Sequence, residues 1–394
     1  MDGNALQKLH EKLCLTSVFI GVLEKPLFTA FSAYVRAENG EAKRKAYAAF
    51  VAEIYRENGS LTACVQRCVF EDENVFVKAI ARGKKTPNCI EQSVKRELET
   101  FSVFASLTTT DFAADMGAQE SDLPAFDSVK ADMVSAYKKR LRGIHKYGYG
   151  VFSSRCMFRL GEDKQIEPIV SADEIGFDTF IGYQEEREKV VENTRAFVQG
   201  RPAANTLLCG DAGTGKSSTV KAVANAFFNE GVRLIELRKD QLSLLPLVMA
   251  KISGNPLKFI IFIDDLSFNR SDDNFSMLKA ALEGSASAKA ENAVIYATSN
   301  RRHIIKESFS DRDGDDVHRN DTLQETLSLS ERFGLVVLFS KPDKKLYLEI
   351  VRTLAQKHGV NMPIGELEIQ AEAFALRKGN RSARCAQQFI DSLL

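Results

Sequence analysis

The stretch Leu207-Leu208-Cys209-Gly210-Asp211-Ala212-Gly213-Thr214-Gly215-Lys216-Ser217-Ser218 decides how the rest of this chain is interpreted. Apolar residues run into a glycine-rich turn, and a segment with helical composition follows from Thr219 to Phe228. From Gly210 to Ser217 the stretch fits the P-loop (Walker A) pattern G-x-x-x-x-G-K-[ST] at every fixed position. It therefore predicts a strand, a phosphate-binding loop and a helix in succession.

The chemistry of phosphate explains this pattern. Polyphosphate is a dense anion, so the loop must turn successive backbone N–H groups inward around it, and glycines permit the backbone angles that this requires. We expect residues 210–218 to bind a nucleotide, Lys216 to reach its β- and γ-phosphates and the Ser217 hydroxyl to ligate Mg²⁺. The alternative is a flexible glycine turn with an incidental Lys-Ser pair, which the strand before it and the helix after it disfavour.

Composition indicates a folded protein of two or three domains. The chain has 394 residues, of which 44% are hydrophobic, enough for packed cores. Lys and Arg number 53, as do Asp and Glu, so the formal net charge is zero. That balance does not favour general adhesion to nucleic acid or to an anionic membrane, although a local basic patch stays possible.

The seven scattered cysteines indicate a reducing compartment rather than a disulfide framework. Cys64 and Cys68 can share a helix face, and without a nearby histidine we expect them to pack in a core rather than bind zinc. The apolar run from Leu13 to Leu23 is too short to span a bilayer. We interpret it as a buried helix of a cytoplasmic protein that does not insert into membranes, with a secretion signal as the weaker alternative.

Residues 1–147 read as an all-helical N-terminal domain, because apolar residues recur there at helical spacing. Its last predicted helix is basic and has interleaved tyrosines. The residues concerned are Tyr137, Lys138, Lys139, Arg140, Arg142, His145, Lys146, Tyr147 and Tyr149. Cations beside stacking rings suit a nucleic-acid or acidic-partner surface. A solvated helix face is the alternative that we favour, because the domain also carries many acids.

After a connector at residues 148–175, strands and helices alternate. Apolar runs at 232–237, 259–263, 293–298 and 335–339 join the strand before the P-loop, with helices expected at 184–198, 241–252 and 275–282. This alternation predicts an α/β domain over residues 176–341, with a parallel five-stranded sheet and helices on both faces. Beyond Pro342 the pattern is purely helical, which predicts a helical lid over residues 342–394.

Polar residues follow the predicted strands at the edge where open α/β sheets bind ligands. Asp264 and Asp265 end the apolar run Ile260-Ile261-Phe262-Ile263 in the manner of a Walker B strand. We expect Asp264 to hold Mg²⁺, and Asp265 to orient or deprotonate the attacking water. Asn300 follows another strand, in Tyr296-Ala297-Thr298-Ser299-Asn300.

These motifs, together with Glu331-Arg332-Phe333-Gly334 and Gly379-Asn380-Arg381-Ser382-Ala383-Arg384, resemble those of AAA+ ATPases in the same order over about residues 165–394. The resemblance implies a five-stranded sheet with a small helical lid. By that likeness Asn300 is sensor 1, Arg332 is an arginine finger for a neighbouring subunit, and Arg381, or less favoured Arg384, is sensor 2. Ile181 and Gly182 lie where the family's adenine pocket begins.

The likeness is closer to the bacterial AAA+ ATP-binding proteins filed as a domain of unknown function. It is carried by Asp-Asp-Leu-Ser-Phe, Tyr-Ala-Thr-Ser-Asn-Arg-Arg-His and Asp-Thr-Leu-Gln-Glu-Thr-Leu-Ser-Leu-Ser-Glu-Arg-Phe-Gly, and it implies an ATPase without implying a substrate. One departure is Asp265, where the usual Walker B motif has Glu, so hydrolysis is expected to be slow. Another is residues 238–244, which lack the aromatic-glycine pair of substrate-threading unfoldases.

The sequence thus predicts an AAA+ ATPase that binds and hydrolyses Mg-ATP and moves an unknown protein or nucleic-acid partner, active as a homo-oligomer through Arg332. The alternative is an ATP-loaded switch or loader with negligible turnover. A P-loop small-molecule kinase is a third interpretation, which Asn300 and Arg332 argue against. The polar segment 310–321 fails the spacing of a calcium loop and is interpreted as an insertion near the subunit boundary.

Overall fold

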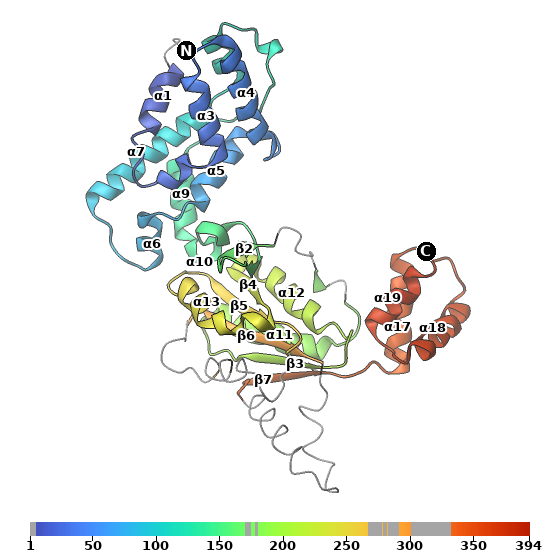
Figure 1. The fold of residues 1–394 in the computed structure, drawn as a ribbon. Helices are drawn as coiled ribbons and strands as arrows, with labels where there is room; N and C mark the ends of the chain where they lie inside the picture. Colours follow the sequence, from blue (N-terminus) through green and yellow to red (C-terminus); the bar gives the residue numbers. More distant parts are fainter. Residues whose placement is uncertain are drawn as a thin grey trace. The chain divides into compact units, whose positions relative to one another are not determined.

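The computed structural model describes residues 5–169, 175–177, 180–266, 278, 282, 291–300 and 332–394 (Figure 1). The chain divides into two compact units. The first contains residues 1–154 and 254–256, and the second contains residues 155–253 and 257–394. The insertion expected at residues 310–321 and nearly all of the helix expected at 275–282 lie outside the described residues.

The first unit is built from helices. They are α1 (Ala5–Leu13), α2 (Ile20–Leu23), α3 (Pro26–Arg36), α4 (Gly40–Tyr55), α5 (Leu61–Glu71), α6 (Val75–Ala81), α7 (Asn88–Ala105), α8 (Thr109–Met116), α9 (Met133–Arg142) and α10 (Ile144–Tyr147). Side chains cap several N-termini: Asn39, Ser60 and Asn74 each accept a hydrogen bond from a backbone N–H in the first turn. Each of these caps marks the start of a helix, and apolar residues that follow it form the buried face of that helix.

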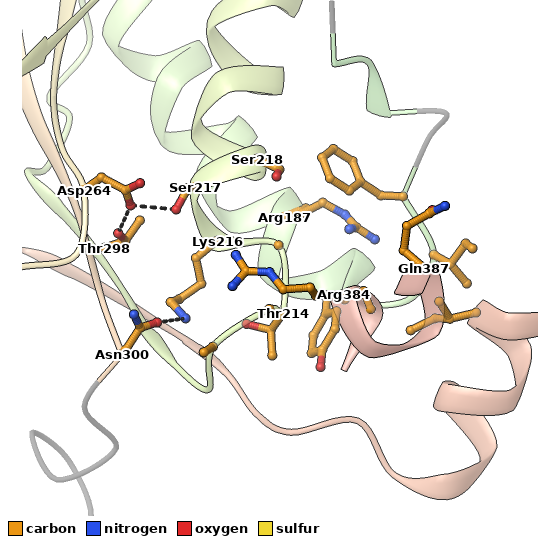
Figure 2. Close-up of a pocket in the computed structure, with 18 of the residues that line it drawn as sticks. Arg187, Thr214, Lys216, Ser217, Ser218, Asp264, Thr298, Asn300, Arg384 and Gln387 are labelled. Atoms are coloured by element: carbon orange, nitrogen blue, oxygen red, sulfur yellow. Dashed lines mark hydrogen bonds between the residues drawn. The ribbon is translucent and has the colours of Figure 1, made fainter. Parts of the chain in front are cut away.

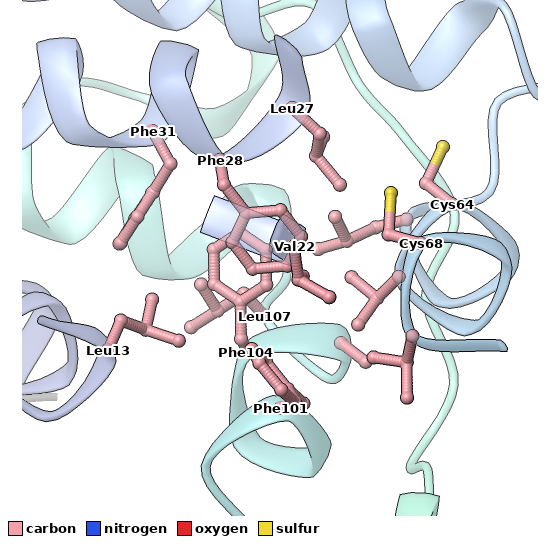
Figure 3. Packing of buried hydrophobic residues seen from close by; sticks show 14 of the residues in the cluster. Leu13, Val22, Leu27, Phe28, Phe31, Cys64, Cys68, Phe101, Phe104 and Leu107 are labelled. Atoms are coloured by element: carbon pink, nitrogen blue, oxygen red, sulfur yellow. The ribbon is translucent and has the colours of Figure 1, made fainter. Parts of the chain in front are cut away.

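Phenylalanine rings dominate the core of this unit (Figure 3). Phe104 of α7 packs against Phe28 and Phe31 of α3, with ring centroids 4.8 Å apart in both pairs. Cys64 and Cys68 on α5 belong to the same cluster, and burial raises the pKa of their thiols to about 12 and about 11. The expectation that these cysteines pack in a core is confirmed. All seven cysteines lie within the described residues and have free thiols.

A buried carboxylate joins two parts of this unit. Glu97 of α7 is only 3% exposed, yet it accepts hydrogen bonds from the backbone N–H groups of Ser17, Val18 and Phe19 just before α2. The Ser17 hydroxyl donates a further bond at 2.8 Å. Several donors offset the cost of burying the charge, so Glu97 fixes the turn between α1 and α2 against α7.

The basic segment of α9 and α10 has few aromatic rings that are exposed and available for stacking. Tyr137 and Tyr149 are buried, and the Arg140 guanidinium lies over the rings of Phe70 and Tyr147. Rings buried in a core cannot stack on bases, which favours the interpretation of a solvated basic face over a nucleic-acid surface. No helix among the residues that the structure describes is both long and apolar enough to cross a bilayer.

Within the residues that the structure describes, the second unit contains one sheet of seven strands in the order β2-β1-β4-β5-β6-β3-β7. The strands are β1 (Met157–Leu160), β2 (Ile166–Pro168), β3 (Thr206–Gly210), β4 (Val232–Leu237), β5 (Lys258–Ile263), β6 (Ala293–Ser299) and β7 (Leu335–Phe339). All neighbours pair in parallel except β2, which runs antiparallel to β1 at the edge. The sheet is therefore mostly parallel, as expected.

The expected count of five strands is wrong. All five expected strands are present, and they form the contiguous part β4-β5-β6-β3-β7. The two additional strands, β1 and β2, come from residues 157–168, which the sequence analysis treats as a connector. They are only four and three residues long, so neither gives a periodic pattern that stands out from a loop.

Helices pack against the sheet, and three further helices follow its last strand in the sequence. α11 (Gln184–Val198) and α12 (Lys216–Ala226) share a hydrophobic cluster with one face, which includes Leu208, Leu234, Phe262 and Tyr296. α13 (Leu245–Ile252) buries four residues after β4. Beyond β7, α17 (Lys344–Lys357), α18 (Ile364–Lys378) and α19 (Ala383–Asp391) form a bundle with its own core around Tyr347 and Phe389, shown in red in Figure 1.

The role of Glu97 gives a prediction about stability. Replacing Glu97 with Ala leaves the buried N–H groups of Val18 and Phe19, and the partly buried one of Ser17, without their acceptor, so we expect the free energy of unfolding to fall by about 3 kcal/mol. Urea denaturation followed by circular dichroism measures it. Glu99→Ala is the matched control, since Glu99 lies on the same helix but is exposed, and its expected cost is below about 0.5 kcal/mol. Equal effects of the two changes would show that the buried cap is not stabilising.

Candidate nucleotide-binding site

The P-loop leaves the carboxyl end of β3 and leads directly into α12. Gly210 has φ +138°, and a Cβ at this position would overlap the backbone carbonyl of Phe339 on β7. Gly213 and Gly215 also have positive φ, and Gly215 is the N-cap of α12. The helix thus begins at Lys216, three residues earlier than expected, with its first N–H groups at the end of the loop.

Three neighbouring strands bring the other polar groups to the same edge. Asp264 follows β5 and Asn300 follows β6, and β6 lies between β5 and β3. The Ser217 hydroxyl donates to Asp264 Oδ1 at 2.6 Å, and Asn300 Nδ2 donates to Asp265 Oδ1 at 2.7 Å. The structure therefore brings together Ser217, Asp264, Asp265 and Asn300, although they are up to 83 residues apart (300 − 217) in the sequence. Figure 2 shows Ser217, Asp264 and Asn300 of this group.

Lys216 is enclosed by this cluster. The residue is only 4% exposed. Its Nζ donates to the carbonyls of Gly210 and Asp211 and to Asn300 Oδ1, at 3.0, 2.6 and 3.0 Å. Burial lowers the pKa of Lys216, although the charges of Asp211, Asp264 and Asp265 raise it. A buried ammonium held by acceptors at the end of a phosphate loop can pair strongly with an anionic ligand.

Thr298 organises the two acids. Its Oγ1 donates to Asp264 Oδ1 at 2.5 Å and accepts a hydrogen bond from the backbone N–H of Asp265 at 3.0 Å. Asp265 itself has φ +51°, a left-handed conformation that few residues other than glycine adopt, though aspartate tolerates it. The end of β5 is thus held in a sharp turn that exposes both carboxylates.

The oxygen donors here suit Mg²⁺. The Ser217 hydroxyl and the Asp264 carboxylate are hard ligands already within hydrogen-bond distance of each other. The described part of the chain contains no cluster of three or more His, Cys, Asp and Glu side chains that could hold a metal. Mg²⁺ commonly takes one or two protein ligands and completes its shell with water and substrate phosphates, so this sparse set fits it.

A pocket of about 540 Å³ opens from these groups toward the C-terminal helices. One end is polar and contains Lys216, Asp264, Asp265, Thr298 and Asn300. The remaining lining is mixed: Ile350, Leu354, Ala383, Phe180 and Ile181 are apolar, and Arg187, Arg384 and Gln387 are polar. A pocket that combines charged groups with apolar side chains suits a nucleotide, which has a charged phosphate end and an aromatic base.

Ile181 and Gly182 behave differently from each other. Ile181 lines the pocket and packs against the core of the C-terminal bundle. Gly182 is not among the lining residues; it has φ +69°, and a Cβ there would overlap Leu346 of α17. The next residue, Tyr183, lines the pocket and donates from its hydroxyl to the carbonyl of Ser340, 2.5 Å away in the link between β7 and α17.

The two arginines proposed for one role are separated by the structure. Arg381 forms a bidentate pair with Glu372 of α18, at 3.0 and 2.9 Å, and is absent from the pocket lining. Arg384, on the first turn of α19, lines the pocket (Figure 2). Its Cβ lies 3.1 Å from where a Cβ of Gly213 would be, so the P-loop and α19 meet closely. The geometry therefore places Arg384, and not Arg381, at the candidate site.

Arg332 lies near the amino ends of the parallel strands, at the opposite end of the strands from the P-loop. It precedes β7, whose first residue Leu335 pairs with Thr206 at the start of β3, whereas the P-loop follows Gly210 at its end. The four residue steps from Leu335 to Phe339 span about 13 Å in an extended strand. Arg332 is accordingly not among the residues that line the pocket.

Several pocket residues were missed in the sequence analysis, among them Thr298 and Arg187. Thr298 was seen only as part of a strand end. Arg187 lines the pocket although it is only 9% exposed. The signal for Arg187 was its register, because α11 buries Arg187, Val190, Thr194 and Phe197, at the spacing of one helix face. An arginine on the buried face of an amphipathic helix is unusual, because arginine is rarely buried unless it has a partner.

The mostly parallel sheet, the P-loop and the acids at the strand ends define an α/β protein with a candidate phosphate-binding site. The chain belongs to the family described as Protein of unknown function (DUF815), whose sequence profile matches residues 153–394. The predicted likeness to a family filed as a domain of unknown function is thereby confirmed.

No curated protein matches the chain. Similar solved structures include the RuvB Holliday junction branch migration motor of Thermotoga maritima, which is 15% identical, with 56% of this chain and 72% of that chain covered and a TM-score of 0.33. A variant of the same protein gives 14% identity, 55% and 72% coverage and a TM-score of 0.33. These likenesses are too distant to indicate what this chain binds.

The close approach at Gly210 predicts a large effect of one methyl group. We expect Gly210→Ala to lower the free energy of unfolding by about 3 kcal/mol, because the Cβ meets the Phe339 carbonyl in addition to straining φ. Gly200→Ala is the matched control, since Gly200 also has positive φ but open space around it; its expected cost is about 1 kcal/mol. Urea titration compares the two, and equal losses would mean that backbone strain alone matters at Gly210.

Proposed function

We propose that this chain is an ATPase that binds Mg-ATP between the P-loop and the C-terminal bundle. The observation that supports the proposal most directly is the hydrogen-bonded cluster of Lys216, Ser217, Asp264, Asp265 and Asn300. It unites a phosphate-binding loop with two carboxylates and an amide at one sheet edge. Phosphoryl transfer depends mainly on positioning and electrostatic stabilisation, which are the contributions that such a cluster makes.

Each group has a role in the proposed reaction. The P-loop N–H groups and Lys216 bind the phosphates, and Ser217 and Asp264 hold Mg²⁺, which neutralises phosphate charge when bound. Asp265 accepts the proton of the attacking water or orients that water. Asn300 donates to the Asp265 carboxylate, so it keeps this carboxylate directed toward the site.

The sensor 2 role passes to Arg384 in this proposal. Arg384 lies on the pocket wall, whereas both guanidinium nitrogens of Arg381 that point toward α18 are engaged by Glu372. A cation on α19 that contacts the nucleotide would connect the nucleotide to the C-terminal bundle. The bundle is then the proposed lid, and its position depends on the nucleotide.

Arg332 is proposed to act on the pocket of a neighbouring subunit. It lies near the amino ends of the strands, whereas the P-loop of the same subunit lies at their carboxyl ends, so Arg332 cannot reach its own nucleotide. An arginine finger supplied in trans would make the active form a homo-oligomer. The client that such an assembly moves is an unidentified protein or nucleic acid, and we propose that the assembly acts in the cytoplasm.

The alternative function is an ATP-loaded switch or loader with negligible turnover. Asp265 favours it, because an aspartate reaches one methylene less far than glutamate toward the water. The contacts of residues 181–183 with the pocket, the bundle and Ser340 suit a switch as well as an enzyme. Both functions require nucleotide binding, so only a rate separates them.

Steady-state ATP hydrolysis over a range of protein concentrations tests the proposal. We expect specific activity to rise with concentration, because Arg332 completes the site of a neighbour, and to fall at least about 100-fold in Lys216→Ala. Asp265→Asn is expected to abolish turnover while ATP still binds. Turnover that persists in Asp265→Asn would contradict the base assignment, and ATP binding without turnover in the wild type would favour the switch.

The choice between the two arginines has its own test. We expect Arg384→Ala to weaken ATP binding roughly tenfold or more, because a charge-assisted contact to the nucleotide is lost. Arg381→Ala removes a partly exposed ion pair with Glu372 and should change affinity by less than about threefold. Titration with a fluorescent ATP analogue measures both. A larger loss for Arg381→Ala would return the sensor role to that residue.

A further inference from the structure

Arg187 of α11 is a buried cation for which the protein supplies little compensation. The residue is 9% exposed and lines the candidate pocket. Within the described residues its side chain has one charged or aromatic contact, the ring of Phe180, whose centroid lies 4.8 Å from Cζ. No carboxylate among those residues forms an ion pair with it, and burial lowers the pKa of the guanidinium more than Glu186 raises it.

The buried position is imposed by the fold. Arg187 shares the inward face of α11 with Val190, Thr194 and Phe197, which pack toward the sheet. It lies one turn from the start of the helix, where the pocket begins, so the guanidinium enters the pocket instead of the core (Figure 2). A guanidinium cannot lose its proton to escape the cost of burial. It therefore needs acceptors, and a ligand in the pocket can supply them.

The position of Arg187 in the pocket indicates which part of a nucleotide it meets. The phosphate end is occupied by Lys216, Ser217, Asp264 and Asn300, and Figure 2 shows Arg187 away from them, on the side of Ser218 and Gln387. Phe180 packs against the Arg187 guanidinium, and the apolar side chains of Ile181, Ile350 and Leu354 also line the pocket. A donor group among apolar side chains, away from the cluster around Lys216, suits a nucleoside better than a phosphate.

We propose that Arg187 is a nucleoside-binding residue, which donates hydrogen bonds to acceptor atoms of the base or the ribose and thereby sets affinity for ATP and ADP alike. The inference rests on the proposed nucleotide binding and adds a residue to it. The guanidinium only donates, so its partners are ring nitrogens, an exocyclic carbonyl or ribose oxygens. Phe180 holds the guanidinium plane in place through the cation–π contact.

Equilibrium titrations of the full chain with ATP, ADP and inorganic tripolyphosphate test the inference, with Arg187→Met as the variant. We expect Arg187→Met to weaken ATP and ADP by the same factor, tenfold or more, and to leave the affinity for tripolyphosphate unchanged. Arg195→Met is the matched control, because Arg195 is an exposed arginine of the same helix and the substitution is identical. It should bind all three ligands like the wild type.

Further arms identify the atoms that Arg187 contacts. If Arg187 donates to the ribose, the wild type should discriminate against 2′-deoxy-ATP or 3′-deoxy-ATP, and Arg187→Met should not. If it donates to the base, the ratio of ATP to GTP affinity should change in the variant instead. Either result supports a nucleoside contact and names its source.

Thermal melting without nucleotide separates binding from a structural role. Removing an uncompensated buried charge should leave the melting temperature unchanged or raise it, whereas a structural arginine would lower it on removal. An equal loss of tripolyphosphate affinity, a loss for ATP but not ADP, or unchanged affinity for all ligands would each overturn the inference. If the wild type binds no nucleotide at all, the proposed function fails first.

Discussion

The candidate site depends on β3 pairing in parallel with β6 on one side and β7 on the other. This pairing places the ends of three strands around the P-loop: Ser299 opposite Cys209, and Phe339 opposite Gly210. The strand ends then supply what the loop lacks, namely Asn300 for Lys216 and, one strand further, Asp264 for Ser217. A slip of one residue in the β3–β6 ladder would move Asn300 out of register with the P-loop.

The same pairing explains why the loop and the C-terminal bundle are coupled. Gly210 lies against the carbonyl of Phe339, and one residue later the chain begins the link to α17. Ser340 in that link accepts the hydroxyl of Tyr183, whose ring packs near Phe339 at a centroid distance of 5.5 Å. Residues at the apolar end of the pocket are thus bonded to the segment about which the bundle would turn. A ligand that orders residues 180–183 would also restrict this link.

Much of this arrangement could be predicted from the sequence because its signals are local. Apolar runs bounded by turns gave strands β3 to β7 within one residue, and the glycine spacing gave the P-loop. The hairpin of β1 and β2 was missed since seven residues around a turn at Lys164 (φ +62°) carry too little pattern. The choice between Arg381 and Arg384 also needs tertiary information: only the ion pair with Glu372 on another helix turns Arg381 away from the pocket. Asp264 and Asn300 were found because strand ends of a parallel sheet meet at one edge.

The backbone conformation at position 265 gives a structural reason for an aspartate there, in addition to the proposed chemical role of its carboxylate. By sequence, the shorter carboxylate appears only as a weakened form of the usual glutamate. In the fold, residue 265 adopts a left-handed φ of +51°, where aspartate is enriched several-fold among residues other than glycine. Thr298 stabilises this turn by accepting the Asp265 N–H, and Asn300 holds the carboxylate. The backbone after β5 thus selects for a residue that tolerates the turn, and the exposed carboxylate is directed by its neighbours rather than by its own length.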